Sequence, residues 1–460
     1  MASPKRFTAA IAGLVAVASM LAATAAQASG LVRDTEIEEI IRKEADPVLA
    51  ASGLEPSAVH IYLVGDKELN AFVVGGQNIF LHTGMIAEAE NPNQLLGVVA
   101  HEAGHISGGH GVRGDLQRAG MKPFLLTMGL GLVAALAGAP DAGAALLTSA
   151  SYFGTLGALT YSRSQEAAAD QAAAAALEKA GISGKGLVDF FDNFRYQEVF
   201  SDARKFQYFR SHPLSSERIE ALRRRVESSR YYNIPDSPEA LETHLIVKAK
   251  LDAFMNPPAQ TFIKYTEKDT SYRARYARAI AYFQNKEPEK ALKAIDALLV
   301  EQPNNPYLWE LKGQVLFEFG RPAEAEPAHR RSVELKPDAP LLHINLGQTL
   351  IALDKPDRLD EAIKELKFAI VAEKDNAVAW RLLGEAYDAK HMPGQARLAF
   401  AEYHYAVGEL GDAKAFAMRS REFLTKDTPD WRRATDIILV SDPTKDDLRA
   451  IARSDGTDSN

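Results

Sequence analysis

Two histidines and a glutamate lie close together in the segment His101-Glu102-Ala103-Gly104-His105, directly after an apolar stretch that favours a buried helix. A separation of four residues puts both imidazoles on one face of a helix, one turn apart, where they can share a metal ion. Glu102 can then take a proton from a water that the metal acidifies. The pattern predicts a metal site with Glu102 as general base, against the alternative of two structural histidines.

The other ligands must also be histidine, aspartate or glutamate, because the chain contains no cysteine. His110 is one candidate, since Gly108 matches part of a longer metalloprotease pattern. That pattern needs its third histidine at position 111, which is Gly111. If the helix continues, His110 lies about 140° round from His105. We therefore expect His110 to pack or to cap rather than to bind metal.

Glu166 is the better candidate for a third ligand. It opens an alanine-rich segment that favours a helix, and Asp170 follows one turn later on the same face. Metal-bound histidines usually donate their other N–H to a carboxylate or carbonyl, so the two acids could serve as a ligand and an outer partner. Periodicity alone would equally make Glu166 a surface residue.

The elements that must position these side chains follow from periodicity and turn residues. Residues 34–50 have apolar side chains at helical spacing. Residues 59–64 and 71–81 are rich in β-formers, and Gly75-Gly76 divides the second segment into two strands. The metal helix is predicted from Gln94 to about Gly109, with Asn93 as its cap.

Two further helices are expected after the metal helix. The alanine-rich one spans residues 164–180 and ends at Gly181. Another lies within residues 202–232, after His212, and its Arg223-Arg224-Arg225 run is predicted to be a solvated face. Residues 124–159 are apolar but broken by Pro140, so neither half is long enough to span a membrane. They are either a pair of buried helices or a flap that contacts a membrane or an unfolded client.

The N-terminus has the features of an export signal. Lys5 and Arg6 precede an apolar run, and Ala26-Gln27-Ala28 fits the small-residue cleavage pattern. We predict cleavage before Ser29 and export, with an uncleaved anchor as the alternative. The formal charge of -8 gives no basic footprint, so a nucleic-acid partner is not expected.

The C-terminal half repeats with a period of 34 residues, lengthened once to 37 near Pro356. Two positions in each unit carry small side chains, which allow paired helices to approach closely. A period of 34 residues with this pattern is typical of tetratricopeptide repeats. We count about four units, whose small residues are Ala279, Gly313, Gly347 and Gly384 at one position and Ala291, Ala325, Ala362 and Ala396 at the other.

Four motifs in order over residues 60–220 resemble the HtpX and CAAX-prenyl-protease family of gluzincin metallopeptidases. Residues 99–105 resemble the zinc helix of that family, and residues 70–84 resemble the strand segment ahead of it. Residues 162–170 resemble the second metal helix, and residues 211–218 the motif that follows. The ordered set is far more specific than the first motif alone.

The resemblance implies one zinc ion per chain as the cofactor. Its ligands would be His101, His105 and Glu166, with Asp170 behind them and Glu102 as the catalytic base.

The resemblance also gives roles to residues outside the two metal helices. His212 would approach the metal, either as a fourth ligand in a resting, self-inhibited state or as a donor to the oxyanion. A closed four-ligand site leaves no position for water. Arg218 would position or stabilise charge nearby, unless it is a surface cation. Asn70, Ala71 and Phe72 would bind an extended substrate by strand addition.

The predicted fold is mostly α-helical: an α+β gluzincin domain with a small sheet, followed by a helical solenoid of tetratricopeptide repeats. The expected divisions are a signal peptide at 1–28, the metalloprotease domain at 29–235, a helical connector at 236–271, the repeats at 272–422, and a C-terminal helix with a polar tail at 423–460. Residues 456–460 are predicted to be disordered.

The leading hypothesis is a periplasmic zinc endopeptidase that degrades misfolded or stalled envelope and outer-membrane proteins. Its repeats would recruit unfolded clients or the outer-membrane assembly machinery. The alternative is a chaperone or adaptor whose protease site is largely autoinhibited. A membrane-embedded protease for prenylated peptides is disfavoured, because the sequence lacks long spanning segments.

Overall fold

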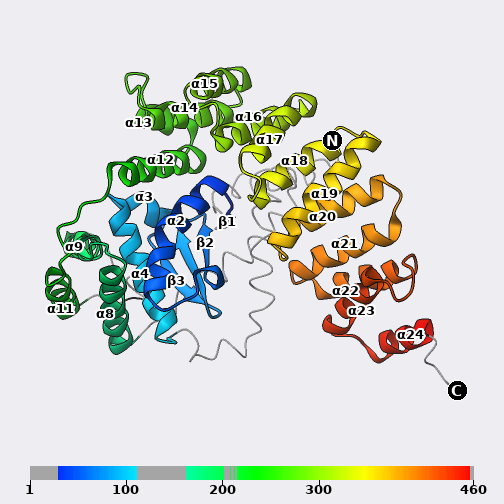
Figure 1. Ribbon diagram of the computed structural model, residues 1–460, viewed down its shortest axis with the longest axis horizontal. Coiled ribbons are helices and arrows are strands. Elements are labelled where there is room, and N and C mark those ends of the chain that lie inside the picture. The colour runs from blue at the N-terminus through cyan, green and yellow to red at the C-terminus, as the bar shows by residue number, and fades with distance from the viewer. Residues whose placement is uncertain (1–29, 111–161, 201–207, 209–211, 213–214, 456–460) are drawn as a thin grey trace, which may run out of the picture.

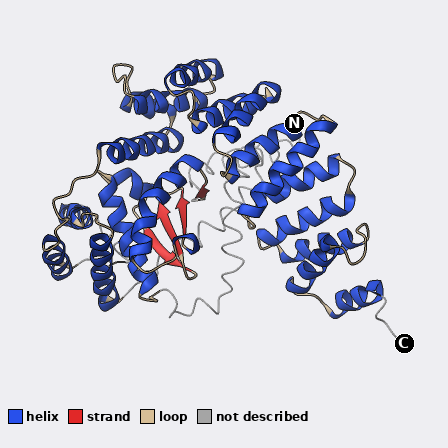
Figure 2. Ribbon diagram, viewed as in Figure 1, coloured by secondary structure: helices blue, strands red, loops and turns tan. Residues whose placement is uncertain are grey.

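A small sheet covered by helices is followed by an arc of helix pairs in the computed structural model (Figure 1, Figure 2). The structure describes residues 30–110, 162–200, 208, 212 and 215–455. The predicted signal peptide, the apolar segment at 124–159 and the tail at 456–460 lie outside these residues. Within them, no helix is long and apolar enough to cross a membrane.

The sheet has four strands in the order β1-β2-β4-β3. β2 and β4 run parallel, whereas β1 and β3 run antiparallel to their neighbours. Gly75 and Gly76 form the turn between β3 and β4 with φ values of 66° and 98°, which glycine adopts without strain. The two strands predicted around this turn are confirmed. The strands are β1 Leu31–Val32, β2 His60–Val64, β3 Ala71–Val74 and β4 Asn78–His82.

Helices surround the sheet, and α4 is the central one because it packs against both α8 and α9. The helix predicted at residues 34–50 is confirmed as α2. The Asp34 side chain caps it by accepting a hydrogen bond from the Ile37 N–H at 2.9 Å. The helices are α2 Thr35–Ala51, the 3-10 turn η1 Pro56–Ala58, α3 Thr83–Glu88, α4 Pro92–Ser107, α8 Arg163–Lys179, α9 Lys185–Phe200 and α11 Ser216–Glu227.

Asn91, and not the predicted Asn93, caps α4. The Asn91 side chain accepts a hydrogen bond from the Gln94 N–H at 2.9 Å. The prediction of Asn93 is wrong because its amide has long-range partners. It donates to the Ser183 carbonyl at 2.7 Å and accepts from the Gly186 N–H at 2.6 Å. Asn93 thus fixes the start of α4 against the start of α9.

Local capping sets both ends of α8. The Ser162 side chain accepts from the Gln165 N–H, and the Gln165 side chain accepts from the Ser162 N–H, which together form a capping box. Beyond the other end, Gly181 takes a φ of 76°. The alanine-rich helix ending at this glycine was predicted and is confirmed.

The basic run on α11 is only partly solvated, because two of its three residues also pair with acids on other helices. Arg223 pairs with Asp192 on α9, and Arg225 pairs with Glu178 on α8 at 2.5 Å. Only Arg224 is exposed. The run therefore joins α11 to its two neighbouring helices.

From α14 onward the chain forms antiparallel helix pairs, and the small repeat residues lie where the paired helices touch. A Cβ on Gly313 would stand 2.1 Å from the His329 ring, and one on Gly347 would stand 2.9 Å from the Leu366 side chain. The lengthened unit adds its three residues to a helix: α19 begins at Pro356 and has 17 residues, whereas α15 and α17 have 14.

The remaining helices lie within residues 238–455. They are α12 Pro238–Met255, α13 Pro258–Lys264, α14 Tyr272–Gln284, α15 Pro288–Glu301, α16 Pro306–Glu318, α17 Pro322–Leu335, α18 Pro340–Ala352, α19 Pro356–Ala372, α20 Ala377–Ala389, α21 Pro393–Ala406, α22 Leu410–Arg421, α23 Pro429–Val440 and α24 Lys445–Asp455. The mostly helical fold with a small sheet is confirmed.

A buried ion cluster joins α2 to the first helices of the C-terminal half. The Lys250 Nζ on α12 lies 2.8 Å from the Asp34 carboxylate and 2.9 Å from that of Glu36. The Tyr276 hydroxyl on α14 donates to Glu36 at 2.9 Å. Lys250 and Glu36 are only 4% and 5% exposed. One buried cation thus pairs with two carboxylates at this junction.

The repeats stay in contact with the N-terminal domain further along their arc, which curves around that domain (Figure 1). The Tyr307 hydroxyl donates to Glu39 at 2.5 Å, and Lys336 lies 3.2 Å from the same carboxylate. The guanidinium of Arg33 donates to both oxygens of Glu373, at 2.7 and 3.1 Å. The repeats from α14 to α19 are therefore held against the segment that contains β1 and α2.

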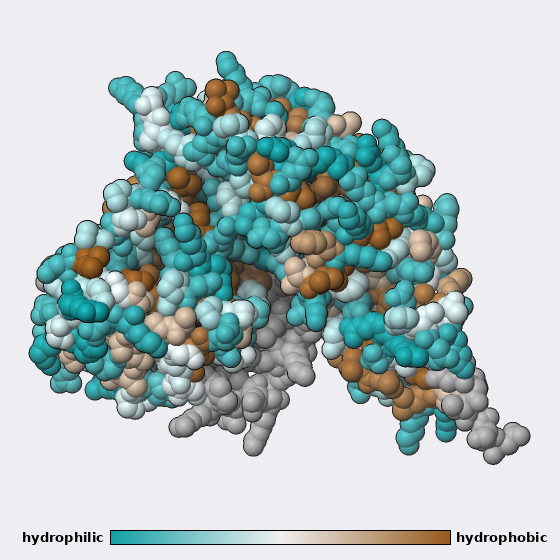
Figure 3. Space-filling model, viewed as in Figure 1, coloured by the Kyte–Doolittle hydropathy of each residue, from teal (hydrophilic) through white to brown (hydrophobic). Residues whose placement is uncertain are grey.

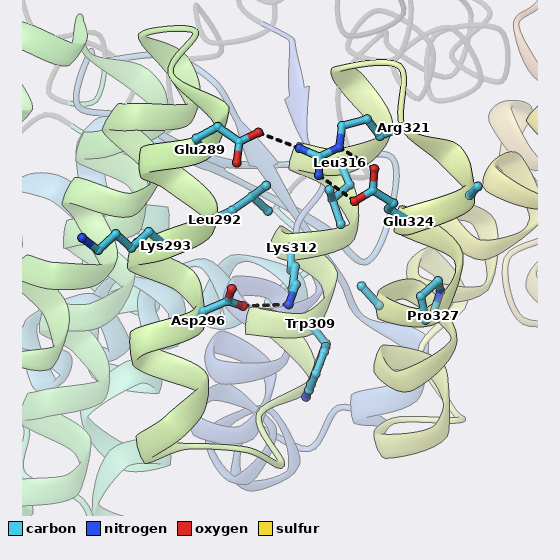
Figure 4. Close-up of a pocket in the computed structure, with 12 residues that line it drawn as sticks. Glu289, Leu292, Lys293, Asp296, Trp309, Lys312, Leu316, Arg321, Glu324 and Pro327 are labelled. Carbon is cyan, nitrogen blue, oxygen red and sulfur yellow. Dashed lines mark hydrogen bonds and ion pairs between the residues drawn. The ribbon is translucent and has the colours of Figure 1, made fainter.

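A groove of about 800 Å³ lies between α15 and α17, over α16 (Figure 4). An ion-paired row of Glu289, Arg321 and Glu324 crosses it, and Lys312 pairs with Asp296 at 2.7 Å. Its lining carries three acidic and three basic residues, so it favours neither sign of charge. Hydrophilic side chains cover most of the visible face of the molecule (Figure 3).

The ion cluster at α2 predicts a strong dependence of stability on Lys250. Lys250→Met should destabilise the full chain by about 3–5 kcal/mol, because it leaves buried carboxylates without their cation. Differential scanning calorimetry measures this as a lower Tm. The control is Lys43→Met, whose pair with Glu239 is 76% and 79% exposed and should contribute little. Equal melting of both variants and the native chain would contradict the role of the cluster.

Candidate metal centre

α4 presents both histidines of its motif to the interior of the N-terminal domain. His101, Glu102 and His105 are fully buried. The Nε2 atoms of His101 and His105 lie 3.1 Å apart, because one helical turn stacks the two side chains on the same face. The predicted convergence of the two imidazoles is therefore present in the structure.

Glu166 on α8 faces the same point. Its carboxylate oxygens lie 3.5 Å from His101 Nε2 and 3.3 Å from His105 Nε2. Gly104 permits this approach, because a Cβ there would stand 2.8 Å from the Ala169 carbonyl oxygen on α8. The glycine within the α4 motif therefore lets the second helix bring its glutamate to the histidines.

His212 completes the group from the chain before α11. Its Nδ1 lies 3.0 Å from Glu166 Oε1 and 3.3 Å from His101 Nε2. Its Nε2 lies 3.6 Å from Glu102 Oε1. The four residues His101, His105, Glu166 and His212 each offer one nitrogen or oxygen, and these atoms all lie within 4.8 Å of one another.

The spacing of these donor atoms fits a tetrahedral metal ion. Metal–ligand distances of about 2.0–2.1 Å place tetrahedral ligand atoms about 3.3–3.4 Å apart. The five separations among the four donor residues given above run from 3.0 to 3.5 Å. A set of three imidazoles and one carboxylate can therefore hold a divalent ion at its centre.

Asp170 and Arg218 lie directly behind the ligand set. Asp170 Oδ1 is 3.0 Å from His101 Nδ1, as expected for an outer partner of a metal-bound histidine. The Arg218 guanidinium binds both oxygens of Asp170, at 2.8 and 2.9 Å, and reaches Glu166 at 2.8 Å. Arg218 is buried, so it is not a surface cation. All three of its nitrogens contact carboxylates.

Burial and the neighbouring charges set the protonation states of the α4 residues. Burial lowers the pKa of His105 to about 3, which keeps this imidazole neutral. Burial also lowers the pKa of His101, but the contacts with Asp170 and Glu166 outweigh it and raise the pKa to about 10. Burial raises the pKa of Glu102, against the opposing effect of His212 and His101. A glutamate of raised pKa is suited to accept and return a proton.

The pKa of Glu166 moves the other way. Burial would raise it, but His212, His101 and His105 together hold the pKa well below its usual range. The carboxylate is therefore ionised, which is the form that binds a metal ion.

The strand predicted to bind substrate is β3, which lies at one edge of the sheet. Phe72 is buried and stacks on Phe80 with ring centroids 5.2 Å apart. Ala71 is also buried, so side-chain contact with a peptide is unavailable and only main-chain pairing remains for these two residues. Both polar atoms of the Asn70 amide are buried without a hydrogen-bond partner among the described residues.

Sequence reasoning missed one residue beside the site, Tyr208. It did name His110, and the expectation that His110 packs rather than binds metal is confirmed. The Tyr208 ring stacks on His212, with centroids 4.6 Å apart, and its N–H donates to the Leu69 carbonyl at 3.2 Å. No periodicity marks Tyr208. Its position four residues before His212 was the one signal in the sequence that the two rings could lie together. The ring of His110 contacts His105, because α4 ends at Ser107 and does not continue as was assumed.

An α+β domain with a buried pair of histidines, an adjacent glutamate and a glutamate from a second helix has the architecture of a metallopeptidase. Residues 32–226 match the model of peptidase family M48, and residues 267–306 and 276–340 match the tetratricopeptide repeat. The chain therefore carries an M48 peptidase domain followed by tetratricopeptide repeats. It is a metalloprotease, and its buried histidines and glutamate form a group suited to a metal ion.

Two curated relatives align with most of this chain, and a third aligns with a shorter part of it. The beta-barrel assembly-enhancing protease of Yersinia pestis is 23% identical over 395 residues, which cover 84% of this chain and 80% of the relative. Its counterpart in Escherichia coli (strain K12) is 23% identical over 390 residues, covering 83% and 78%. Metalloprotease LoiP of Escherichia coli is 30% identical over 178 residues, covering 38% of this chain and 64% of the relative.

The contacts of Arg218 predict an effect on metal binding. Arg218→Lys keeps the charge but loses the planar fork that holds Asp170 and Glu166. We expect metal affinity to fall by about 10–100-fold, as measured by chelator competition. The control is Arg224→Lys, an exposed position on the same helix. Unchanged affinity with a lower kcat would support the oxyanion role instead.

Proposed function

We propose that this protein is a periplasmic zinc endopeptidase for misfolded or stalled envelope and outer-membrane proteins. One observation carries the proposal: a converging set of four buried donor residues lies beside a buried glutamate of raised pKa. Three imidazoles and a carboxylate suit zinc, which accepts nitrogen and oxygen ligands in this geometry. His101, His105 and Glu166 would hold one ion per chain, and Asp170 would orient His101.

Glu102 is the proposed general base. Zinc bound at this site would acidify a water molecule and polarise the scissile carbonyl. Glu102 accepts the proton of the attacking water and delivers it to the leaving nitrogen, which balances the proton over the reaction. His212 or Arg218 would steady the tetrahedral oxyanion once a substrate is present.

The structure favours the resting role for His212. Its Nδ1 occupies a corner of the donor set, 3.0 Å from Glu166 and 3.3 Å from His101. A fourth protein ligand at that corner excludes the catalytic water. Cleavage then requires His212 to leave, after which its ring could donate to the oxyanion.

Substrate binding is proposed at β3 by strand addition, which uses main-chain hydrogen bonds and selects little for sequence. The amide of Asn70 has no hydrogen-bond partner within the described part of the chain. This supports strand addition, since buried polar groups normally find partners and a peptide backbone would supply them. The repeats would recruit unfolded clients or the assembly machinery. The export signal predicted at residues 1–28 and the relatives named for β-barrel assembly support a periplasmic role. Residues 124–159 remain a proposed site of peripheral membrane contact.

The second candidate function is a chaperone or adaptor with a largely autoinhibited site. The position of His212 within the donor set favours this adaptor function. A metal site closed by His212 would not cleave peptides, and the repeats could still bind clients.

Zinc binding and peptide cleavage should respond differently to single substitutions. We expect about one zinc per native chain by plasma mass spectrometry, and its loss in His101→Ala. Glu102→Gln should keep the zinc but abolish cleavage of an unfolded outer-membrane protein, because the amide cannot accept the proton. The exposed His60→Ala is the control and should change neither. Undiminished cleavage by Glu102→Gln would remove the proposed base.

Replacing His212 distinguishes the two functions. His212→Ala opens a corner of the donor set, so basal cleavage of casein should rise if His212 inhibits. A fall in kcat with zinc retained would favour the oxyanion role. Continued absence of cleavage in both native and His212→Ala chains, with client binding intact, would favour the adaptor.

A further inference from the structure

The C-terminal end of α4 is a sharply defined turn. Ser107 is the last helical residue, Gly108 follows at a φ of -75°, and Gly109 takes a φ of 64°. The His110 N–H donates to the His105 carbonyl at 3.0 Å, and the Gly109 N–H donates to the Ile106 carbonyl at 3.0 Å. These two hydrogen bonds and the left-handed glycine make a Schellman motif.

A Schellman motif brings together the residue two positions beyond the cap and the residue three from the end of the helix. Here those residues are His110 and His105. Their Nδ1 atoms lie 3.1 Å apart, and their rings meet edge to face with centroids 5.1 Å apart.

Gly108 provides the space for this contact. A Cβ at Gly108 would stand 2.6 Å from His110 Nε2. The two glycines therefore have separate tasks: Gly109 turns the chain back, and Gly108 leaves room for the returning imidazole.

The chemistry of His105 requires an acceptor on its Nδ1 side. Its Nε2 faces the donor set, 3.1 Å from His101 Nε2 and 3.3 Å from Glu166. A neutral imidazole that binds metal through Nε2 carries its hydrogen on Nδ1, and that N–H needs a partner to fix the ring. His101 has such a partner in Asp170, whose Oδ1 lies 3.0 Å from its Nδ1.

We propose that His110 is the corresponding positioning residue for His105: it accepts the His105 Nδ1–H and holds the ring so that Nε2 points at the metal. This inference rests on the proposed zinc site. His110 is not a ligand, since it lies outside the group of four residues whose donor atoms converge. The two α4 histidines are thus held by different outer partners, a carboxylate from α8 and an imidazole from the end of their own helix.

The test measures zinc affinity on the full chain by chelator competition. His110→Ala should weaken zinc binding by about 10–100-fold, the usual cost of losing an outer partner of a metal-bound histidine. His110→Asn places an amide oxygen near the position of Nδ1 and should restore affinity to within a few-fold of native. Gly108→Ala should also weaken zinc, because its Cβ displaces the His110 ring without changing its chemistry.

A second readout separates positioning from folding. His110 is only partly buried, so the Tm of the zinc-free His110→Ala chain should stay close to native. The Tm gained on adding zinc should shrink, because stabilisation by a ligand follows its affinity. The exposed His60→Ala serves as the control in both measurements.

Native zinc affinity in His110→Ala would overturn the proposal. Equal weakening in His110→Ala and His110→Asn would overturn the acceptor role, since it would mean that only packing is lost. Affinity is measured without substrate, so a native chain that binds zinc but cleaves nothing would refute the protease function and leave this comparison intact.

Discussion

The close contact between α4 and α8 at Gly104 is the constraint on which the rest of the site depends. A larger side chain at Gly104 would meet the α8 backbone at Ala169, and Glu166 lies one turn before that point. With the helices this close, His101, His105, Glu166 and His212 share one buried volume. Burying so many ionisable groups is costly unless they are paired or coordinate a metal. Arg218 and Asp170 provide the pairing, and the proposed ion would provide the rest.

One helix links this site to the repeats. α2 packs on both α4 and α8 through its apolar face, and it meets the C-terminal half through the acidic residues at its start. Glu36 reaches Lys250 and Tyr276, while Glu39 reaches Tyr307 and Lys336. α2 therefore contacts both the solenoid and the two metal helices. The buried ion cluster at this junction favours one fixed arrangement over a loose tether, because its charges would otherwise need solvent.

The roles proposed for His212 and His110 affect the metal site in two different ways. His212 comes from a separate segment and competes with water for a corner of the donor set. His110 comes from the end of α4 itself and acts on the orientation of a single ligand. The first depends on long-range packing that can change, whereas the second is built into a helix cap. The zinc helix would thus carry two ligands, a base and the outer partner of one ligand in a single short stretch of sequence.

The sequence by itself determined several features that depend on near neighbours. The one-turn spacing of His101 and His105, the turn at Gly75-Gly76, the end of α8 and the period of the repeats all follow from local geometry. Only the tertiary structure decided what depends on partners distant in the chain. Asn93 makes contacts across 90 residues in place of its predicted capping role, and Arg223 and Arg225 pair with acids on other helices. The convergence of His212 and Arg218 on Glu166 is of the same kind, since spacing along the chain gives no distance between separate helices. Even the local turn that returns His110 to His105 was missed, because α4 was expected to run to about Gly109 and ends at Ser107.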